Sequence, residues 1–339
     1  MRAMAQMLKR LIIVGLLLLG TVTAVAVWWV NQPFQLVIPK GEQVVDVQVA
    51  ANETPRRVAS NLVEAGVQTS AKLLFEWFRW SGKATAIQAG SYEVSPGTTP
   101  RQLLDMLTSG KQATRKVTIL EGWTFKQVRK ALRDASYLRS KTGDMSDAAI
   151  MKAIGREGVH PEGRFFPDTY VYPKNSADLA VLMQAAARMD AQLTTAWNYR
   201  DKTTPVDTPE ELLTLASIIE KETNREADRG LVAGVFANRL RIGMRLQTDP
   251  TVIYGLGDAF DGNLRRIHLR TDTPYNSYTR AGLPPSPISM PSEASLRAAV
   301  NPANTEALYF VAKGDGTSAF NDDLDGHNAA VRRYILKRP

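Results

Sequence analysis

The 339-residue sequence contains no cysteine and only three histidines. The absence of thiols excludes disulfides, thiolate metal sites and cysteine nucleophiles. The histidines, His160, His268 and His327, lie far apart and lack the HExxH spacing of zinc enzymes, so we expect no metal site. A Walker-type phosphate loop and the GxSxG elbow of serine hydrolases are missing as well. No motif therefore indicates a cofactor.

Clusters of a single charge sign are also missing, although the formal net charge is +8. Arg2, Lys9 and Arg10 supply three of these charges, and basic and acidic residues are interspersed along the rest of the chain. Nucleic-acid binding favours a concentrated basic stripe with aromatic platforms, so we expect no nucleic-acid partner. A modest positive excess suits an anionic polymer or a membrane surface.

One long uncharged run, LIIVGLLLLGTVTAVAVWWV, occupies residues 11–30. As a helix it would cross about 30 Å of hydrocarbon, with Trp28 and Trp29 at the far interface. The cations before it predict that residues 1–10 stay in the cytoplasm and that the rest of the chain is exported. A cleaved signal peptide is the alternative, because Ala24-Val25-Ala26 has the small-x-small form of a cleavage site. Signal cores span roughly 7–15 residues and this run is longer, so we favour an uncleaved transmembrane anchor.

Residues 31–43 are predicted to form an extended linker, and residues 44–112 a small module. In the module, VVDVQVA (44–50) alternates like a strand, and a helix capped by Thr54 ends at Gly66. SAKLLFEWFRWSG predicts a second helix, AGSYEV a second strand, and PRQLLDMLTSG a third helix that ends at Gly110. The βααβ order resembles that of a LysM module, the small fold that grips N-acetylglucosamine chains. A purely structural spacer domain fits the same order.

Residues 113–339 are predicted to form a larger domain with several helices and unusually polar, aromatic loops at 161–173, 245–257 and 273–294. The last loop is rich in proline, which excludes regular helix and central strand. Long ordered loops of this kind usually line binding sites. The predicted fold class is therefore α+β, with one N-terminal transmembrane helix, a small LysM-like βααβ module and a larger mixed α+β catalytic domain.

The stretch LASIIEKETNR (215–225) places two carboxylates where an apolar helical pattern is strongest. Thr208 caps the predicted helix, Pro209 takes its first position, and Glu211 completes a capping box. The apolar residues cover most of the helix surface, so the helix should be largely buried.

The two glutamates of this helix differ in their expected partners. Glu222 has Arg225 three residues later, within reach of a helical ion pair that would keep it charged and ordinary. Glu220 has only uncharged residues at the same offsets, and a carboxylic acid in such surroundings tends to hold its proton, as a general acid must. We therefore select Glu220 as the candidate acid. The simpler alternative is a glutamate that emerges into solvent at the helix end.

The surrounding loops are suited to carbohydrate, because aromatic faces with neutral donors match the apolar faces and hydroxyl edges of sugars. Glycoside hydrolysis normally requires a second carboxyl group, and Asp249 is the nearest candidate, although an aspartate before a proline also opens turns. The loop residues are Tyr170, Tyr172, Tyr254, Tyr275, Tyr278, Gln247 and Asn276.

Five ordered motifs together resemble the YceG-like family, the endolytic murein transglycosylases of the bacterial inner membrane. They are EGRFFPDTY (162–170), LASIIEKET (215–223), VFANRLRIGMRLQTDPTVIYGLG (235–257), TPYNSY (273–278) and GLPPSPIS (282–289). The resemblance implies a lyase that cuts the β-1,4 bond between N-acetylmuramic acid and N-acetylglucosamine, leaves a 1,6-anhydro-muramoyl end and terminates nascent strands beside peptidoglycan synthases. It also implies a LysM-like module and a single-pass inner-membrane protein with a cytoplasmic N-terminus and a periplasmic catalytic domain.

The resemblance further implies that the first glutamate of the EKET motif, Glu220, is catalytic, and that one carboxyl group is sufficient. Glu220 would protonate the glycosidic oxygen and then accept the proton of the muramic 6-hydroxyl. We expect Gln247, Tyr254, Asn276 and Tyr278 to position the sugars. The alternatives are a hydrolytic muramidase that uses Glu220 with Asp249, and a non-enzymatic membrane-anchored glycan-binding scaffold.

Overall fold

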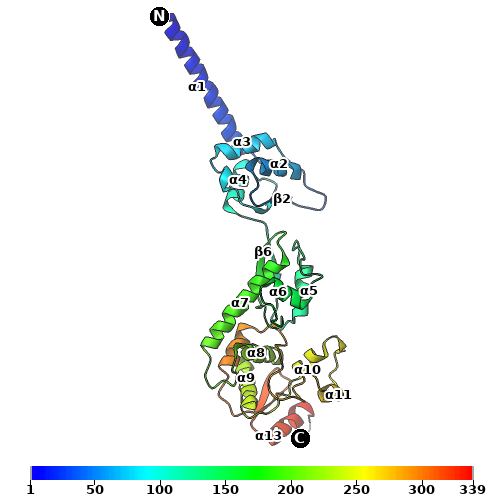
Figure 1. The fold of residues 1–339 in the computed structure, drawn as a ribbon. Coiled ribbons are helices and arrows are strands. Elements are labelled where there is room, and N and C mark those ends of the chain that lie inside the picture. Colours follow the sequence, from blue (N-terminus) through cyan, green and yellow to red (C-terminus); the bar gives the residue numbers. More distant parts are fainter. Residues whose placement is uncertain (1, 338–339) are drawn as a thin grey trace. The chain divides into compact units, whose positions relative to one another are not determined.

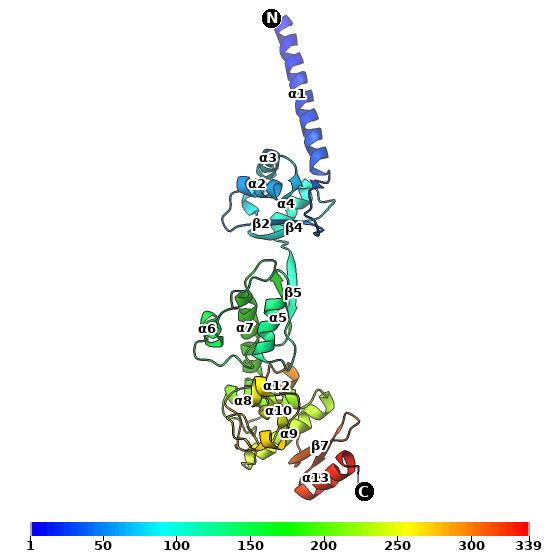
Figure 2. The same cartoon turned by 90° about the vertical axis from the view of Figure 1, so that its right-hand side faces the viewer.

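A computed structural model describes residues 2–337 and divides the chain into two compact units. Unit 1 comprises Met1–Arg115 and Pro173–Asn175, and unit 2 comprises Lys116–Tyr172 and Ser176–Pro339. Figures 1 and 2 label many of the helices and several of the strands. Met1, the start of the predicted cytoplasmic segment 1–10, and residues 338–339, the end of the predicted domain 113–339, lie outside the described residues. The mixed α+β fold class is confirmed.

Unit 1 begins with helix α1 (Arg2–Val30). Its segment Gln6–Val30 is long and apolar enough to cross a membrane, and its most apolar window is not buried inside the protein. A signal sequence would meet the same criteria of length and composition. Length and composition therefore do not distinguish a membrane anchor from a signal sequence.

The rest of unit 1 is built around the antiparallel pair β2 (Val45–Val49) and β4 (Gly90–Val94). Alternate residues of β2 are buried, as its sequence pattern predicts. Helices α2 (Pro55–Ala65), α3 (Ala71–Trp80) and α4 (Pro100–Ser109) complete the core with Leu62, Leu74 and Phe78. Inside the predicted linker 31–43, β1 (Gln35–Leu36) pairs with β3 (Val67–Gln68). The predicted strand–helix–helix–strand order is formed, and the resemblance to LysM stays a prediction.

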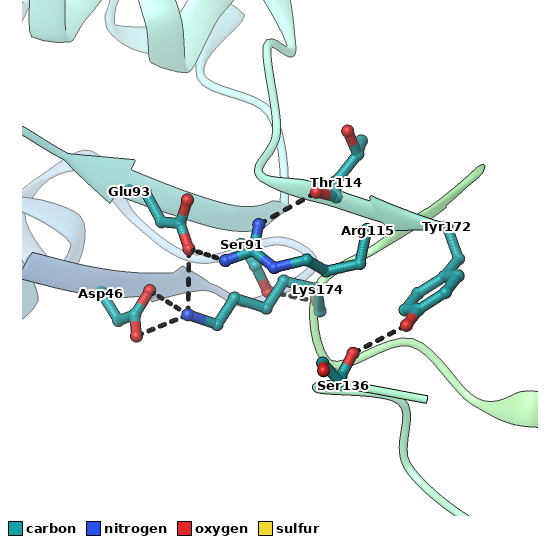
Figure 3. A network of polar contacts seen from close by, with 8 residues as sticks. All are labelled: Asp46, Ser91, Glu93, Thr114, Arg115, Ser136, Tyr172 and Lys174. Carbon is teal, nitrogen blue, oxygen red and sulfur yellow. Dashed lines mark hydrogen bonds and ion pairs between the residues drawn. The ribbon is translucent and has the colours of Figure 1, made fainter. Parts of the chain in front are cut away.

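Lys174 is buried at the edge of unit 1, with only 2% of its side chain exposed (Figure 3). Its Nζ donates to Asp46 Oδ1 and Oδ2, both at 2.7 Å, and to Glu93 Oε1 at 3.0 Å. Burial alone would lower the pKa of Lys174, but the hydrogen bonds to Asp46 and Glu93 outweigh it and raise the pKa above its usual value. The backbone of Lys174 is also held, because its N–H donates to Ala113 O and its carbonyl accepts from Ser91 Oγ.

Replacing this lysine should destabilise unit 1. The Lys174→Met variant keeps the side-chain volume but leaves two neighbouring carboxylates without their shared cation, which we expect to cost about 3 kcal/mol of unfolding free energy. Urea unfolding of the variant and of the exposed-site control Lys72→Met measures the difference. Equal unfolding free energies for the two variants would contradict the prediction.

Unit 2 contains two hydrophobic cores that share helix α7 (Asp178–Asn198). The first core surrounds the helices α5 (Phe125–Asp134) and α6 (Asp147–Ala153), next to the paired strands β5 (Thr114–Thr118) and β6 (Thr169–Pro173). The second core surrounds the helices α8 (Pro209–Glu222), α9 (Glu226–Arg241) and α12 (Glu293–Val300), whose labels lie together in Figure 2. The remaining elements are α10 (Asp249–Leu256), α11 (Arg266–Arg270), the antiparallel strands β7 (Tyr309–Ala312) and β8 (Ser318–Asn321), and α13 (Leu324–Ala330).

Candidate active site

Helix α8 carries both candidate glutamates at its C-terminal end. Its predicted N-cap and first position are confirmed, because Thr208 Oγ1 accepts a hydrogen bond from Glu211 N at 3.1 Å and Pro209 takes the first helical position. The predicted capping box is wrong, because Glu211 Oε2 accepts from Asp207 N at 2.6 Å and not from Thr208 N. The predicted burial is also confirmed, since every residue from Leu212 to Glu220 is buried. The helix ends at Glu222 because Thr223 has an extended backbone, with φ −147° and ψ 132°.

Glu220 is 5% exposed and contacts the N-terminus of α12. Its Oε2 accepts hydrogen bonds from Ser292 N at 2.9 Å, Ser292 Oγ at 2.5 Å and Ser295 Oγ at 2.7 Å. Ser292 is the N-cap residue of α12, so the Glu220 carboxylate lies where a helix N-terminus favours negative charge. Glu220 therefore joins α8 to α12.

The other carboxylate oxygen, Glu220 Oε1, accepts no hydrogen bond from the described residues and is not enclosed by them. Glu220 lines a cavity of about 480 Å³ together with Glu121, Asp168 and Arg229. Burial and the neighbouring Glu220 raise the pKa of Glu121. This cavity contains none of the predicted sugar-positioning residues.

The predicted ion pair between Glu222 and Arg225 is wrong. Arg225 Nε instead lies 3.7 Å from Asp228 Oδ1, and Glu222 Oε2 accepts a hydrogen bond from Thr248 Oγ1 at 2.6 Å. The reason is that α8 ends at Glu222, so the three-residue spacing no longer places the two side chains on one helix face. Glu222 is therefore not held charged by a helical ion pair. Local ion pairing thus does not favour Glu220 over Glu222 as the candidate acid.

Glu222 is half-buried and lines a separate cavity of about 440 Å³. Burial raises the pKa of Glu222, and Asp249 raises it further, whereas the Thr248 hydrogen bond and Arg239 act in the opposite direction without cancelling the shift. A raised pKa is the property that lets a carboxylic acid donate a proton near neutral pH. The sequence argument assigned this property to Glu220.

Three predicted residues from the polar loops line the Glu222 cavity: Gln247, Asp249 and Tyr278. The Tyr278 hydroxyl donates to Asp249 Oδ1 at 2.6 Å, and burial followed by this contact raises the pKa of Tyr278. Gln247 has a left-handed backbone with φ 47°, which is uncommon outside glycine and typical of residues held at functional sites. Its N–H donates to Ser277 O at 3.1 Å, which fixes one loop against the other.

The Glu222 cavity is also lined by four residues that the sequence analysis did not select: Arg239, Tyr309, His327 and Asn328. Arg239 lies over the Tyr309 ring at 5.2 Å, and the His327 ring stacks on Tyr309 at 5.1 Å. Burial and then Arg239 lower the pKa of His327, so its imidazole is neutral at neutral pH. Its Nδ1 is buried without a partner among the described residues. Among these four residues, only the adjacent His327 and Asn328 form a pattern that can be seen in the sequence.

Tyr254 and Asn276 lie outside the Glu222 cavity. Tyr254 packs edge-on against Tyr275 with ring centroids 4.8 Å apart. Asn276 is 1% exposed, and its Nδ2 donates to the carbonyls of His268, Leu269 and Thr271. Its Oδ1 accepts from Tyr278 N at 2.9 Å, so Asn276 shapes the loop that presents Tyr278.

Tyr254 also contacts Glu162, a carboxylate that is only 3% exposed. Glu162 Oε1 accepts from Phe125 N at 3.0 Å, and Oε2 accepts from the Tyr254 hydroxyl at 3.2 Å. Burial outweighs these hydrogen bonds and raises the pKa of Glu162 to about 7.

This shift should make the protein less stable as pH rises. Between pH 4.5 and about pH 7 the unfolded chain releases the Glu162 proton while the folded chain keeps it, so stability falls by about 3 kcal/mol and then levels off. The Glu162→Gln variant should lose this fall and be more stable than the parent at pH 8. Urea unfolding from pH 4.5 to 8 tests this, with exposed Glu306→Gln as the control that keeps the parent slope.

The described residues contain no group of three or more His, Asp or Glu side chains placed to hold a metal ion. The expectation of a site without metal or cofactor stays a prediction.

Comparison with known proteins gives consistent results. The chain matches the YceG-like family over residues 47–333. It is 31% identical over 311 residues to the endolytic murein transglycosylase of Bacillus subtilis (strain 168), covering 87% of this chain and 86% of that relative. The endolytic murein transglycosylase of Streptococcus pneumoniae (serotype 2, strain D39) is 25% identical over 329 residues, and the match covers 87% of this chain and 59% of that relative. The crystal structure of a YceG-like protein from Listeria monocytogenes is similar with a TM-score of 0.53 and 28% identity, covering 85% of this chain and 98% of that one.

Proposed function

The chain belongs to the YceG-like family, and from this we propose that it is an endolytic murein transglycosylase, a lyase that acts on peptidoglycan glycan strands. The bond that we propose it cleaves is the β-1,4 bond between N-acetylmuramic acid and N-acetylglucosamine, with a 1,6-anhydro-muramoyl product. The names of the Bacillus and Streptococcus relatives support the activity.

We propose Glu220, the first glutamate of the EKET motif, as the catalytic acid, as the resemblance to the family implies. The observation that supports this proposal is that Glu220 is buried and lines a cavity with Glu121 and Arg229. One of its carboxylate oxygens is held by Ser292 and Ser295 at the N-terminus of α12, which orients the acid. Glu222, which has a raised pKa and lines a separate cavity, is the rival acid.

The proposed reaction needs one carboxyl group and no added water. Protonated Glu220 donates its proton to the glycosidic oxygen while the bond from that oxygen to C1 of muramic acid breaks, and the bonding electrons leave with the oxygen. The departing N-acetylglucosamine keeps a 4-hydroxyl. The muramic 6-hydroxyl then attacks C1, and the Glu220 carboxylate accepts its proton, which restores the acid.

Other side chains supply charge and position. The transition state carries positive charge near C1, which the carboxylate of Asp168 in the Glu220 cavity would stabilise. Gln247 and Tyr278 offer an amide and an aromatic face to the sugars. Tyr254 packs against Tyr275, and Asn276 accepts a hydrogen bond from the backbone of Tyr278. Both residues would therefore hold the loop that carries Tyr278 in place.

Hydrolysis is the rival reaction, in which Asp249 would act together with Glu220 and activate a water. Product masses separate the two reactions. The full chain is incubated in detergent with purified un-crosslinked glycan, and the products are weighed by mass spectrometry. The lyase releases anhydro ends without added water, whereas a muramidase adds one water per cut, and a glycan-binding scaffold releases no product.

The proposed place of action is the periplasmic face of the inner membrane, next to peptidoglycan synthases. In this arrangement α1 is an uncleaved anchor, residues 1–10 are cytoplasmic, and the exported part comprises the LysM-like module 44–112 and the catalytic domain 113–339. The apolar segment Gln6–Val30 supports the anchor. The intact mass of the membrane-extracted protein tests it, because a cleaved signal peptide would shorten the chain.

A further inference from the structure

Helix α3 carries an exposed apolar stripe on the outside of unit 1. Leu73, Trp77 and Trp80 recur at helical spacing, and Leu73 and Trp80 are 44% and 70% exposed. Leu74 and Phe78, on an adjacent face of the helix, are completely buried in the core. Trp77 also packs against this core, so only the exposed residues Leu73 and Trp80 are not required to attach α3 to its own unit.

The stripe has the composition of a membrane-interface helix. Trp77 is partly buried and turns its polar edge inward, since its Nε1 donates to Pro100 O at 3.2 Å. Exposed Lys72 and Arg79 flank the apolar residues, and Arg79 is paired with Glu76 at 2.5 Å. Exposed tryptophan and leucine beside cations are typical of helices that lie in the headgroup region of a bilayer.

The short connection to α1 keeps unit 1 close to any membrane that α1 spans. Only residues 31–33 separate Val30, the last residue of α1, from Phe34, which belongs to the unit 1 core. Val30 is itself buried and Trp29 packs against the same core, so the end of α1 is fixed to unit 1. Four residues reach at most about 14 Å, which is less than the width of a small domain. Part of the surface of unit 1 must then meet the lipid headgroups.

We propose that this part is the α3 stripe, and that Leu73 and Trp80 insert into the outer interface of the same bilayer that α1 spans. The proposal rests on the proposed anchor but not on enzymatic activity. Lipid contact through α3 would fix which side of unit 1 faces the membrane and leave its other surfaces open to glycan.

The absence of cysteine makes a direct test possible, because a single introduced thiol is labelled alone. The full chain is reconstituted in nanodiscs of phosphatidylethanolamine and phosphatidylglycerol with a bimane label at position 73 or 80. Labels at the exposed positions 64 and 111 of the same unit are the controls. Lipids with a nitroxide near the headgroup should quench the labels at 73 and 80 about threefold more than the controls. Replacing Trp80 by serine should reduce quenching at position 73.

Co-elution of the protein with the nanodisc tests membrane anchoring by α1 independently of any lipid contact by α3. Quenching at positions 73 and 80 no greater than at positions 64 and 111 would overturn the proposal. A change in label emission at position 80 on adding an N-acetylglucosamine oligosaccharide, without lipid quenching, would identify the stripe as a sugar platform instead.

Discussion

The Glu220→Gln variant is expected to lose glycan cleavage by about 1,000-fold or more, because an amide cannot donate the proton that the leaving oxygen requires. Folding should be retained, since the amide oxygen can still accept the hydrogen bonds from Ser292 and Ser295. The measurement is the rate of formation of anhydro-ended products from un-crosslinked glycan, together with a thermal melt. Glycan binding should stay within a few-fold of the parent, because the cavity keeps its shape.

The matched comparison is Glu222→Gln, two residues later on the same helix. This variant should keep cleavage within about tenfold of the parent, because it leaves the proton donor Glu220 in place. Loss of cleavage in Glu222→Gln with retention in Glu220→Gln would transfer the catalytic role to Glu222. Retention in both would favour the scaffold.

The second large effect concerns stability. The Glu220→Ala variant should lose about 3 kcal/mol of unfolding free energy, because the buried donors of Ser292 and Ser295 lose their common acceptor. The Glu222→Ala variant should lose about 1 kcal/mol or less, because it removes one hydrogen bond and also a carboxylate whose ionised form is disfavoured by burial.

Urea unfolding at pH 7 measures both free energies. Ser292→Ala combined with Ser295→Ala should reproduce much of the Glu220→Ala loss, and adding Glu220→Ala to that double variant should cost less than it does alone. Additive losses would show that Glu220 is not stabilising α12 through these serines.

The sequence predicted those features that depend on local signals. The start of α8 follows from Thr208 and Pro209, which act within one turn of helix. Gln247 and Tyr278 were selected because polar and aromatic residues gather in proline-rich loops, and the structure places both in one cavity. Such signals do not depend on the distant parts of the chain.

The errors arose where a distant partner decides the outcome. Glu222 looked paired because Arg225 is near in sequence, but the helix ends between them and Thr248 is the actual partner. Glu220 looked unpartnered because Ser292 and Ser295 lie more than 70 residues away. No periodicity or spacing rule reports contacts of this range, so helical neighbours alone gave Glu222 the wrong partner and could not reveal the serines that contact Glu220.

The position of Lys174 has a practical consequence for dissecting the molecule. Unit 1 is not one continuous segment of the chain. The tripeptide Pro173–Asn175 belongs to it, although the preceding 57 residues, Lys116–Tyr172, belong to unit 2. A fragment that stops at Arg115 would leave Asp46 and Glu93 without the ammonium group that they share. Domain-exchange chimaeras with relatives should therefore transplant Lys174 together with Asp46 and Glu93, or omit all three.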